Sequence, residues 1–456
     1  MFWHNRLIPA ALIACWLAAC GSEQTNEFDD SNTTPESNNN TAVSGDSIDG
    51  NNSSDQPGNT TGDNDNNLPA DSTEQLVEKI QRVSLAADST ELNDDSGQVD
   101  GVSLARVSSD GRFVAFTTVA SNAIADDQNG FSDVFYRNRS TGEIRKISIG
   151  ANGEATDNHS SLNDMTPDGR YLVFSSNSTN IVPSGTRGAA QVYRHDTQTG
   201  ETLLVSQNSA GQAGNDASID AQISADGQTI VYRSFANNII EADTNGFADV
   251  VIFNAQTMQS ASMTVNNYLD FENRSVTHDF TADGTTILLS LGDNFSDGRG
   301  ITLLHKPETG ELEDIEHEFG INSAFVPKFI SDNGEYIVYS DRISNQIFRL
   351  NLSNRTSQLV SVNTTTGINV NPDISADGRH ISYQNFTTGN IYLRDMSSEQ
   401  TVQATFGLNG TAPNGDSGSA KMIGDAGLIA FRSRASNLVE NDNNFKQDIF
   451  IYRTNL

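Results

Sequence analysis

A strand–turn–strand unit recurs along this chain and restricts its fold more than any other sequence feature. Its clearest copy is residues 223–232, which read as a short strand, an Asp-Gly turn and a fully apolar strand. Asp-Gly favours the positive φ angles that close a tight hairpin. Five Asp-Gly turns, one Asn-Gly turn and one degraded copy, Asp-Ala-Gly, occur along the chain. Their glycines are Gly111, Gly169, Gly227, Gly284, Gly334, Gly378 and Gly427. Their spacing, from 44 residues (Gly334 to Gly378) to 58 residues (Gly111 to Gly169), is typical of propeller blades.

Each unit contains the parts of a four-stranded blade. The strand after the turn is apolar at nearly every position, so both of its faces should be covered. A third strand follows after a polar loop, as at 133–136, and then a more polar fourth strand, as at 144–148. The sequence therefore predicts an all-β fold, a seven-bladed β-propeller.

The two ends of the repeat array predict how the ring closes. The seventh unit ends after its third strand, at residues 449–452, and has no fourth strand of its own. The array begins with a lone segment, residues 80–84, that is similar to the fourth strands of other units. We expect these two segments to pair, because pairing would remove an exposed sheet edge.

The N-terminus has the pattern of a bacterial lipoprotein signal. Arg6 precedes an apolar run, residues 7–19, that is too short to span a bilayer as a stable helix. The run ends in Leu-Ala-Ala-Cys, which resembles the lipobox in which the cysteine is acylated. We therefore predict a signal peptide at residues 1–19 and lipidation of Cys20; an ordinary secretory signal with an incidental cysteine is the alternative. By this resemblance, Gly21 after the cysteine implies the outer membrane of the cell envelope.

Residues 20–78 are predicted to be a disordered tether rich in Asn, Ser and Asp. Residues 21–78 contain thirteen acidic side chains, no Lys or Arg, and few apolar residues. The propeller is assigned to residues 79–456. The chain has a formal net charge of −32, which weighs against nucleic-acid partners and against adhesion to an anionic membrane surface. We expect a monomer that meets the membrane only through its lipid anchor.

The repeat, with its (Ser/Thr)-Xaa-Asp-Gly turn and later Asp-Val-Phe and Thr-Gly, is similar to the TolB-type, WD40-like propeller repeat of bacterial periplasmic proteins. The resemblance covers residues 80–456 and implies a β-propeller located in the cell envelope. It departs from TolB in having seven units rather than six, and in lacking the small α/β domain ahead of them. The role of TolB itself is therefore not implied.

No specific catalytic motif is present. The sequence lacks a Gly-Xaa-Ser-Xaa-Gly elbow, a His-Glu-Xaa-Xaa-His pair and a phosphate-binding glycine loop. Some polysaccharide lyases are propellers that hold a metal through several histidines. The six histidines of the repeat region occupy different places in their units, which favours surface or packing roles: His159, His195, His278, His305, His317 and His380.

Three loops between second and third strands share the spacing Asp-Xaa-Asn-Xaa-Xaa-Xaa-Asp. Oxygen side chains at this spacing could bind Ca²⁺. The alternative, which we favour, is that the Asn turns the loop and the last Asp caps backbone N–H groups. The residues are Asp127, Asn129 and Asp133; Asp243, Asn245 and Asp249; Asp442, Asn444 and Asp448.

The loops that enter the first strands are also polar. In a propeller they would lie on one face near the central channel, where they could bind a cation, a sugar or a basic loop of a partner. They could equally form a solvated rim. The candidate residues are Asp157, Asn158, Asn215, Asp216, Asn414 and Asp416.

These observations together predict a non-catalytic binding or scaffolding module of the bacterial cell envelope, with an envelope protein or polysaccharide as its partner. Two alternatives remain open at the sequence level. One is a carbohydrate-active enzyme, a lyase or hydrolase on a propeller face, and the other is a purely structural envelope protein. Paired carboxylates or clustered histidines in a cleft would favour the enzyme.

Overall fold

A computed structural model describes the propeller part of the chain. The described residues are 80–96, 105–125, 127–241, 243, 246, 248–263, 275–292, 301–315, 328–341, 343–362, 367–424, 427–454 and 456. The chain divides into two units, Met1–Ala70 and Asp71–Leu456, and all described residues belong to the second. The predicted signal peptide, Cys20 and the tether lie outside the described residues. Within the described ranges, no helix has the length and apolar character needed to cross a membrane.

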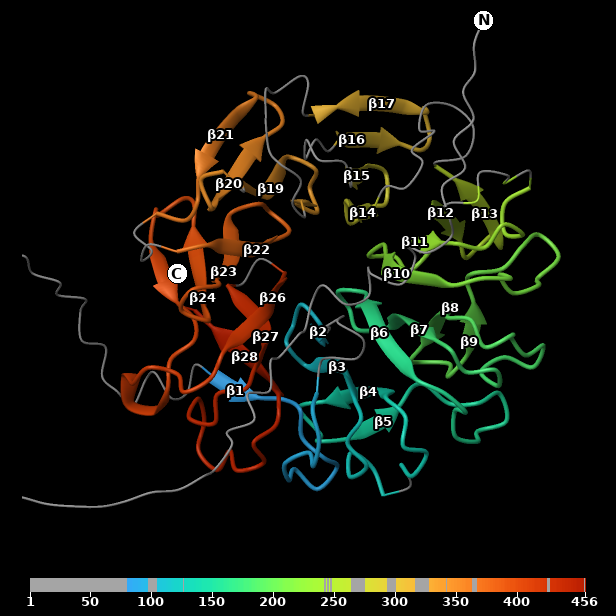
Figure 1. The fold of residues 1–456 in the computed structure, drawn as a ribbon, viewed down its shortest axis with the longest axis horizontal. Coiled ribbons are helices and arrows are strands. Elements are labelled where there is room, and N and C mark those ends of the chain that lie inside the picture. The colour runs from blue at the N-terminus through green and yellow to red at the C-terminus, as the bar shows by residue number, and fades with distance from the viewer. Residues whose placement is uncertain are drawn as a thin grey trace, which may run out of the picture. The chain divides into compact units, whose positions relative to one another are not determined.

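Seven four-stranded antiparallel sheets surround a central channel (Figure 1). The predicted all-β, seven-bladed propeller is thus confirmed. The first strand of each blade is innermost and the following strands lie successively further out.

The first four blades follow one another along the chain, each built from the inside outward. Blade one has β2 (Ala105–Val107), β3 (Phe113–Thr118), β4 (Asp133–Asn138) and β5 (Ile144–Lys146). Blade two has β6 (Ser160–Met165), β7 (Tyr171–Ser176), β8 (Gln191–Asp196) and β9 (Thr202–Leu204). Blade three has β10 (Ser218–Ile223), β11 (Thr229–Ser234), β12 (Asp249–Asn254) and β13 (Gln259–Ser262). Blade four has β14 (Ser275–Phe280), β15 (Ile287–Gly292), β16 (Ile301–Lys306) and β17 (Glu311–Asp314).

Blade five has β18 (Lys328–Ile330), β19 (Tyr336–Asp341), β20 (Gln346–Asn351) and β21 (Thr356–Leu359). Blade six has β22 (Asn369–Ile374), β23 (His380–Asn385), β24 (Asn390–Asp395) and β25 (Thr401–Gln403). Blade seven has β26 (Ser417–Ile423), β27 (Leu428–Ser433), β28 (Asp448–Arg453) and β1 (Ile80–Arg82). One short 3₁₀ helix, Leu408–Gly410, links blades six and seven.

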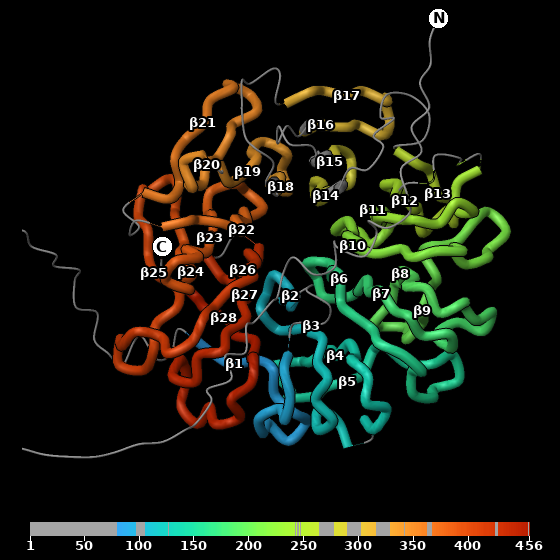
Figure 2. Tube along the Cα trace, viewed as in Figure 1, coloured from blue at the N-terminus to red at the C-terminus, as the bar shows by residue number. Residues whose placement is uncertain are grey.

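The outermost strand of blade seven comes from the start of the described chain. β1 pairs antiparallel with β28, with Ile80 opposite Tyr452 and Arg82 opposite Phe450. Figure 2 shows β1, in blue, beside the red strands of the C-terminus. Ile80 is buried, with 2% of its surface exposed, against residues of blades six and seven.

The second strands are apolar on both faces because each blade packs between two neighbours. In β3, Val114 and Phe116 belong to a core shared with blade seven. Ala115, between them, belongs to a core shared with blade two that contains Leu172 and Phe174. Alternation along a strand therefore sends side chains to two different cores, and neither face is left for polar residues.

Hydrogen bonds explain the (Ser/Thr)-Xaa-Asp-Gly turn. In blade three, the Ser224 hydroxyl donates to Asp226 at 2.6 Å and accepts the Thr229 N–H at 2.9 Å. Asp226 in turn accepts the Gln228 N–H at 2.9 Å. The same set recurs in blade two through Thr166 and Asp168. The Ser or Thr and the Asp therefore satisfy the backbone donors that the hairpin leaves without strand partners.

The turn glycine is required twice, by its conformation and by its close contact with the preceding blade. Gly227 has a φ of +73°, and an added Cβ would overlap the Tyr171 ring of blade two. Arg194 also lies against that ring, 4.5 Å from its centroid, and donates to the Gly227 carbonyl. Gly378 contacts Tyr336 of blade five in the same way. The turns thus join neighbouring blades as well as neighbouring strands.

Candidate functional site: a polar belt in the central channel

One position of the repeat directs its side chains into the central channel. It lies on the innermost strand, five residues before the turn glycine. Together with Lys421, which precedes the last of them, these residues line one cavity, and we call the set the channel belt: Arg106, Asp164, Gln222, Asp279, Phe329, Asp373, Lys421 and Met422.

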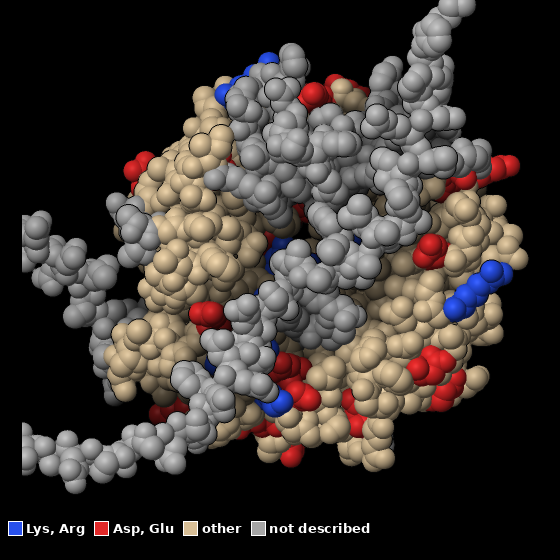
Figure 3. Space-filling view, viewed as in Figure 1, with Lys and Arg blue, Asp and Glu red and all other residues tan. Residues whose placement is uncertain are grey.

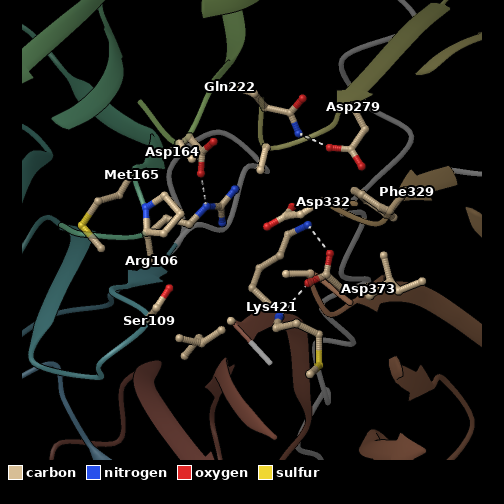
Figure 4. Close-up of a pocket in the computed structure, with 18 of the residues that line it drawn as sticks. Arg106, Ser109, Asp164, Met165, Gln222, Asp279, Phe329, Asp332, Asp373 and Lys421 are labelled. Atoms are coloured by element: carbon tan, nitrogen blue, oxygen red, sulfur yellow. Dashed lines mark hydrogen bonds and ion pairs between the residues drawn. The ribbon is translucent and has the colours of Figure 1, made fainter. Parts of the chain in front are cut away.

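The channel belt surrounds a cavity of about 370 Å³, at the end of the channel where the Asp-Gly turns lie. This volume is at the lower end of the range for small-molecule sites. Figure 4 shows the polar side chains of the belt converging from different blades, and Figure 3 shows Lys and Arg atoms at the centre of the ring. The fold therefore brings together, around one cavity, side chains that are far apart in the sequence.

Three side-chain pairs cross the boundaries between blades. The Arg106 guanidinium lies 2.7 Å from Asp164, and the Lys421 ammonium lies 2.9 Å from Asp373. The Gln222 amide donates to Asp279 at 3.0 Å. Lys421 also lies 4.1 Å from the centroid of the Phe329 ring, a cation–π distance.

Each belt aspartate also accepts a backbone N–H from the next blade. Asp164 accepts from Ile223 at 3.1 Å, Asp279 from Ile330 at 2.8 Å, and Asp373 from Met422 at 2.6 Å. These bonds hold the carboxylates in fixed positions and at the same time fasten blade two to three, four to five and six to seven.

Bulges in the innermost strands adjoin the belt. The register shifts between Ile219 and Gln222 in β10, and between Val370 and Asp373 in β22. Asp220 and Asn371, inside these bulges, have left-handed φ angles of 57° and 50°. A bulge re-aims the side chains beside it, so the irregularity accompanies the residues that face the cavity.

Asp279 has an unusual environment. Burial raises its pKa to about 7, and the negative charge of Asp373 acts in the same direction. The Ile330 N–H, Lys421 and Gln222 favour the ionised form but only partly offset the burial. A carboxyl group of this kind changes its charge near neutral pH.

The acidic loop of blade one encloses a lysine. The Lys146 ammonium lies 3.0 Å from Asp127 and also contacts Asp133. Asn129 accepts the Phe131 N–H at 3.0 Å and donates its amide to Asp133. Burial raises the pKa of Asp127. Lys146 thus occupies the space between the carboxylates that a calcium ion would need, and the Asn closes a turn.

The acidic loop of blade seven has the same design, with an arginine from β1. Arg82 lies 3.3 Å from Asp442 and 3.5 Å from Asp448. Asn444 accepts the Lys446 N–H at 2.9 Å and donates to Asp448 at 3.0 Å. Burial, reinforced by the Asp448 charge, raises the pKa of Asp442 to about 6.

Blade three differs from blades one and seven at the position that Lys146 or Arg82 occupies in those blades. Phe135 is opposite Lys146 in blade one, whereas Val251, its counterpart, is opposite Ser262. Asp243 and Asp249 are described, and Asn245 lies outside the described residues. Across the described part of the chain, no group of three or more His, Cys, Asp or Glu side chains is arranged to hold a metal ion.

The loops predicted to face the channel lie at the other ends of the innermost strands, roughly 15–20 Å from the belt by strand length. Their side chains fasten each loop to the one after the second strand of the same blade. Asn215 donates to Asn237 at 2.7 Å, and Asn414 donates to Ser436 at 2.9 Å. Asp157, Asn158, Asp216 and Asp416 precede β6, β10 and β26 at the same end. Asp157 accepts the Thr179 N–H at 2.7 Å in the same way, whereas Asn158 and Asp216 each accept the N–H of the residue that follows. A ligand of these loops stays a prediction.

The five described histidines are spread over blades two, four and six and lie on different strands or loops. His159 precedes β6 and its Nδ1 accepts the Ser132 N–H at 3.0 Å. Burial lowers the pKa of His195 on β8, and that of His278 on β14, to about 4. His305 lies on β16 and His380 on β23, and His317 lies outside the described residues.

The sequence contains a signal for the belt that the repeated motifs do not reveal. Counting back five residues from each turn glycine gives Arg, Asp, Gln, Asp, Phe, Asp and Met, so five of the seven residues at this position are polar. The alternation of side chains along a strand shows that these residues share one face of the innermost strands. It does not show that this face lines the central channel.

The sequence matches no protein-family model, and a comparison with curated proteins gives no match. Solved structures do share the fold. A prolyl endopeptidase aligns with a TM-score of 0.50 and 11% identity, over 84% of this chain and 52% of its own. An oligogalacturonate lyase from Vibrio parahaemolyticus aligns with a TM-score of 0.50 and 10% identity, over 76% and 88%. TolB from Acinetobacter baumannii aligns with a TM-score of 0.39 and 12% identity, over 77% and 83%.

These similarities concern the fold alone, because the identities are low. The chain spans about half the length of the prolyl endopeptidase that it matches. The propeller predicted from the repeats is confirmed by the seven four-stranded sheets of this structure.

Proposed function

We propose that this protein is a non-catalytic binding module of the bacterial cell envelope, and that the cavity inside the channel belt holds part of its ligand. The observation that carries the proposal is the convergence of polar and charged side chains from different blades on one cavity. Most of these groups are held by ion pairs and backbone hydrogen bonds, and fixed polar groups around a cavity are the usual means of orienting a ligand.

The envelope location is supported by the N-terminal sequence. The lipobox-like Leu-Ala-Ala-Cys ending at Cys20 would attach the protein to lipid, most simply in the outer membrane, and residues 20–78 would separate the propeller from the bilayer. We also propose that β1 closes the ring, so that the tether leaves the propeller at the closure. Replacement of Cys20 by Ser should then move the protein from the membrane fraction to the soluble fraction. Retention in the membrane would show another anchor.

The binding role is tested by filling the channel. Ala282 lines the cavity beside an Asp-Gly turn, so Ala282→Trp should obstruct the cavity. Envelope extracts from the source bacterium should contain a component that binds the wild-type chain and is lost with this variant. A Trp at the exposed Asn354, on the outer edge of blade five, is the control. Equal capture by all three proteins would contradict a channel site.

A carbohydrate-active enzyme remains the second candidate because of one observation. A carboxyl group with a pKa of about 7 suits a general base, and Asp279 faces the cavity. If the protein is a lyase, incubation with polygalacturonate should release unsaturated products that absorb in the ultraviolet, and Asp279→Asn should abolish them. Absence of products with the wild-type chain would favour the binding module.

A further inference from the structure

The charges of the channel belt do not balance. The belt has three carboxylates, Asp164, Asp279 and Asp373, but only two cations. Both cations are already in ion pairs, Arg106 with Asp164 and Lys421 with Asp373. Among the described side chains, no ion pair joins a Lys or Arg to Asp279. One negative charge of the belt is therefore left without its own cation, and Asp332, which also lines the cavity, adds a fourth carboxyl group to the wall.

Asp279 also receives fewer hydrogen bonds than a carboxylate can accept. Its two oxygens accept one bond each, from the Gln222 amide and from the Ile330 N–H, and both donors are neutral. A carboxylate has about four acceptor sites, so it can take further donors. The side-chain oxygen of Gln222 is buried and has no donor among the described residues. This side of the cavity thus offers acceptors and negative charge.

An aromatic ring lies on the adjacent blade. Phe329 lines the same cavity, and its ring already attracts the Lys421 ammonium at 4.1 Å. A ring face next to a carboxylate suits a positively charged group with an alkyl stem, because the ring covers the stem and its quadrupole favours the charge.

An anionic ligand is disfavoured by the same geometry. Arg106 and Lys421 are each already neutralised by an aspartate. An anion would therefore meet two compensated cations together with the further negative charge of Asp279. A neutral ligand would leave the charge of Asp279 uncompensated.

We propose that the cavity binds a cationic N–H group, a guanidinium or an alkylammonium, through Asp279, with Phe329 beside the ligand's alkyl stem. The proposal rests on the proposed function, since it names the chemistry of the ligand in that cavity. The group could belong to a basic side chain of a partner protein or to a free amine. The positive charge on an N–H donor is common to both.

The test uses the full chain, purified in detergent, and calorimetric titration with three probes. N-acetyl-arginine amide represents a basic residue within a protein, putrescine represents a free amine, and N-acetyl-citrulline amide is a neutral analogue of the first. At least one cationic probe should bind, with an affinity about tenfold or more above that of the citrulline analogue. Which of the two binds more tightly distinguishes the sources. Equal binding of the arginine and citrulline compounds, or no binding of any probe, would overturn the proposal.

Two variants separate Asp279 from general acidity. Asp279→Asn keeps the shape of the side chain and should weaken cation binding about tenfold or more. Glu311→Gln removes the same charge from the exposed outer strand of the same blade and should leave binding unchanged. Circular dichroism checks that both variants fold. Equal weakening by both would mean nonspecific attraction to an acidic protein and would overturn the proposal.

The outcome is separable from that of the channel test. If Ala282→Trp abolishes capture of the envelope component but Asp279→Asn and the cationic probes do not affect it, the cavity is the binding site and the cationic chemistry is wrong. If Ala282→Trp has no effect on capture, the channel site itself is wrong and this proposal falls with it.

Discussion

Gly227 and Gly200 separate two reasons for a glycine at a turn, the backbone conformation and the lack of space for a side chain. Gly200 has a similar φ of +78° but nothing within 4 Å of its missing Cβ, whereas a Cβ on Gly227 would overlap Tyr171. We predict that Gly200→Ala lowers the free energy of unfolding by about 1 kcal/mol, the cost of a left-handed alanine. Gly227→Ala should cost a further ~1–3 kcal/mol, the usual effect of overpacking.

Urea unfolding of the two variants provides the measurement. The free energies should differ by at least the overpacking contribution, while the slope with denaturant should stay the same. Equal destabilisation by both substitutions would show that the Tyr171 contact is easily relieved, and that turn geometry alone selects glycine.

Asp279 should make stability depend on pH. Its folded pKa of about 7 lies above the ordinary value for Asp, so the folded state binds a proton that the unfolded state does not until the pH nears 4. Stability should therefore fall as pH rises, by about 1.4 kcal/mol between pH 6 and pH 8. Asp279→Asn should remove this component.

The comparison of wild type with variant is essential, because other groups act in the opposite direction. His195 and His278 have pKa values lowered to about 4 by burial, so they cost stability as pH falls below their ordinary value. Identical pH profiles of unfolding for the two proteins would contradict the raised pKa of Asp279.

Residue-level prediction from the sequence succeeded where a local rule applies and failed where only the assembled ring supplies the context. The turn function of Asn129 and Asn444 follows from Asx chemistry, which needs only neighbouring residues. Lys146 and Arg82 could not be assigned to the acidic loops, because their partners come from another strand of the blade. Predicting the channel belt would have required knowing which face of the innermost strands lines the channel.

At the scale of the element, β1 brings a charged side chain as well as a fourth strand to blade seven. Arg82 contacts Glu91 at 2.7 Å and lies beside Asp448, of which 1% is exposed. We predict that Arg82→Ala costs about 3 kcal/mol, because it leaves a buried carboxylate without its cation. Arg82→Lys should recover most of this, since Lys146 serves the equivalent loop of blade one.

Chemical unfolding of both Arg82 variants is the measurement. Lys446→Ala is the matched control, because Lys446 pairs with Asp94 on the exposed rim of the same region and should cost about 1 kcal/mol or less. If Arg82→Ala cost no more than the control, the buried cluster would contribute nothing to the attachment of β1.

The acidic loops themselves should behave as turns. We predict that Ca²⁺ raises the melting temperature no more than Mg²⁺ at equal ionic strength, because Lys146 and Arg82 already occupy two of the three loops. Asp243→Asn should be nearly silent. A Ca²⁺-specific increase that disappears in Asp243→Asn would instead identify blade three as a metal site.

At the scale of the whole molecule, the pairing of β1 with β28 predicts two contrasting truncations. Deletion of residues 1–78 should leave a stable propeller. Deletion through Ser84 removes buried Ile80 and Val83, the Arg82 cluster and one edge of pairing, and should cost roughly 5 kcal/mol or more. Thermal and urea unfolding compare the two, and equal midpoints would show that β1 is dispensable.

The fold could be predicted because seven copies of one pattern give the same information seven times. The spacing of the turn glycines and the apolar second strands indicated the blades, and the lone strand at residues 80–84 indicated its partner. The candidate site was harder to predict, because its cavity is lined by the position at which the repeats differ, such as Arg106 in one blade and Phe329 in another. Repeats are recognised from the residues that their copies share, so a variable position draws no attention.

That divergence has a consequence for stoichiometry. A ring of seven identical blades would present the same wall after each rotation by one blade, and a molecule in the channel could adopt seven equivalent poses. In this protein the wall reads Arg, Asp, Gln, Asp, Phe, Asp and Lys-Met around the axis. No rotation reproduces that order, so an asymmetric guest would have one preferred orientation. A nearly symmetric ring would therefore bind such a molecule in one orientation, with one molecule per ring.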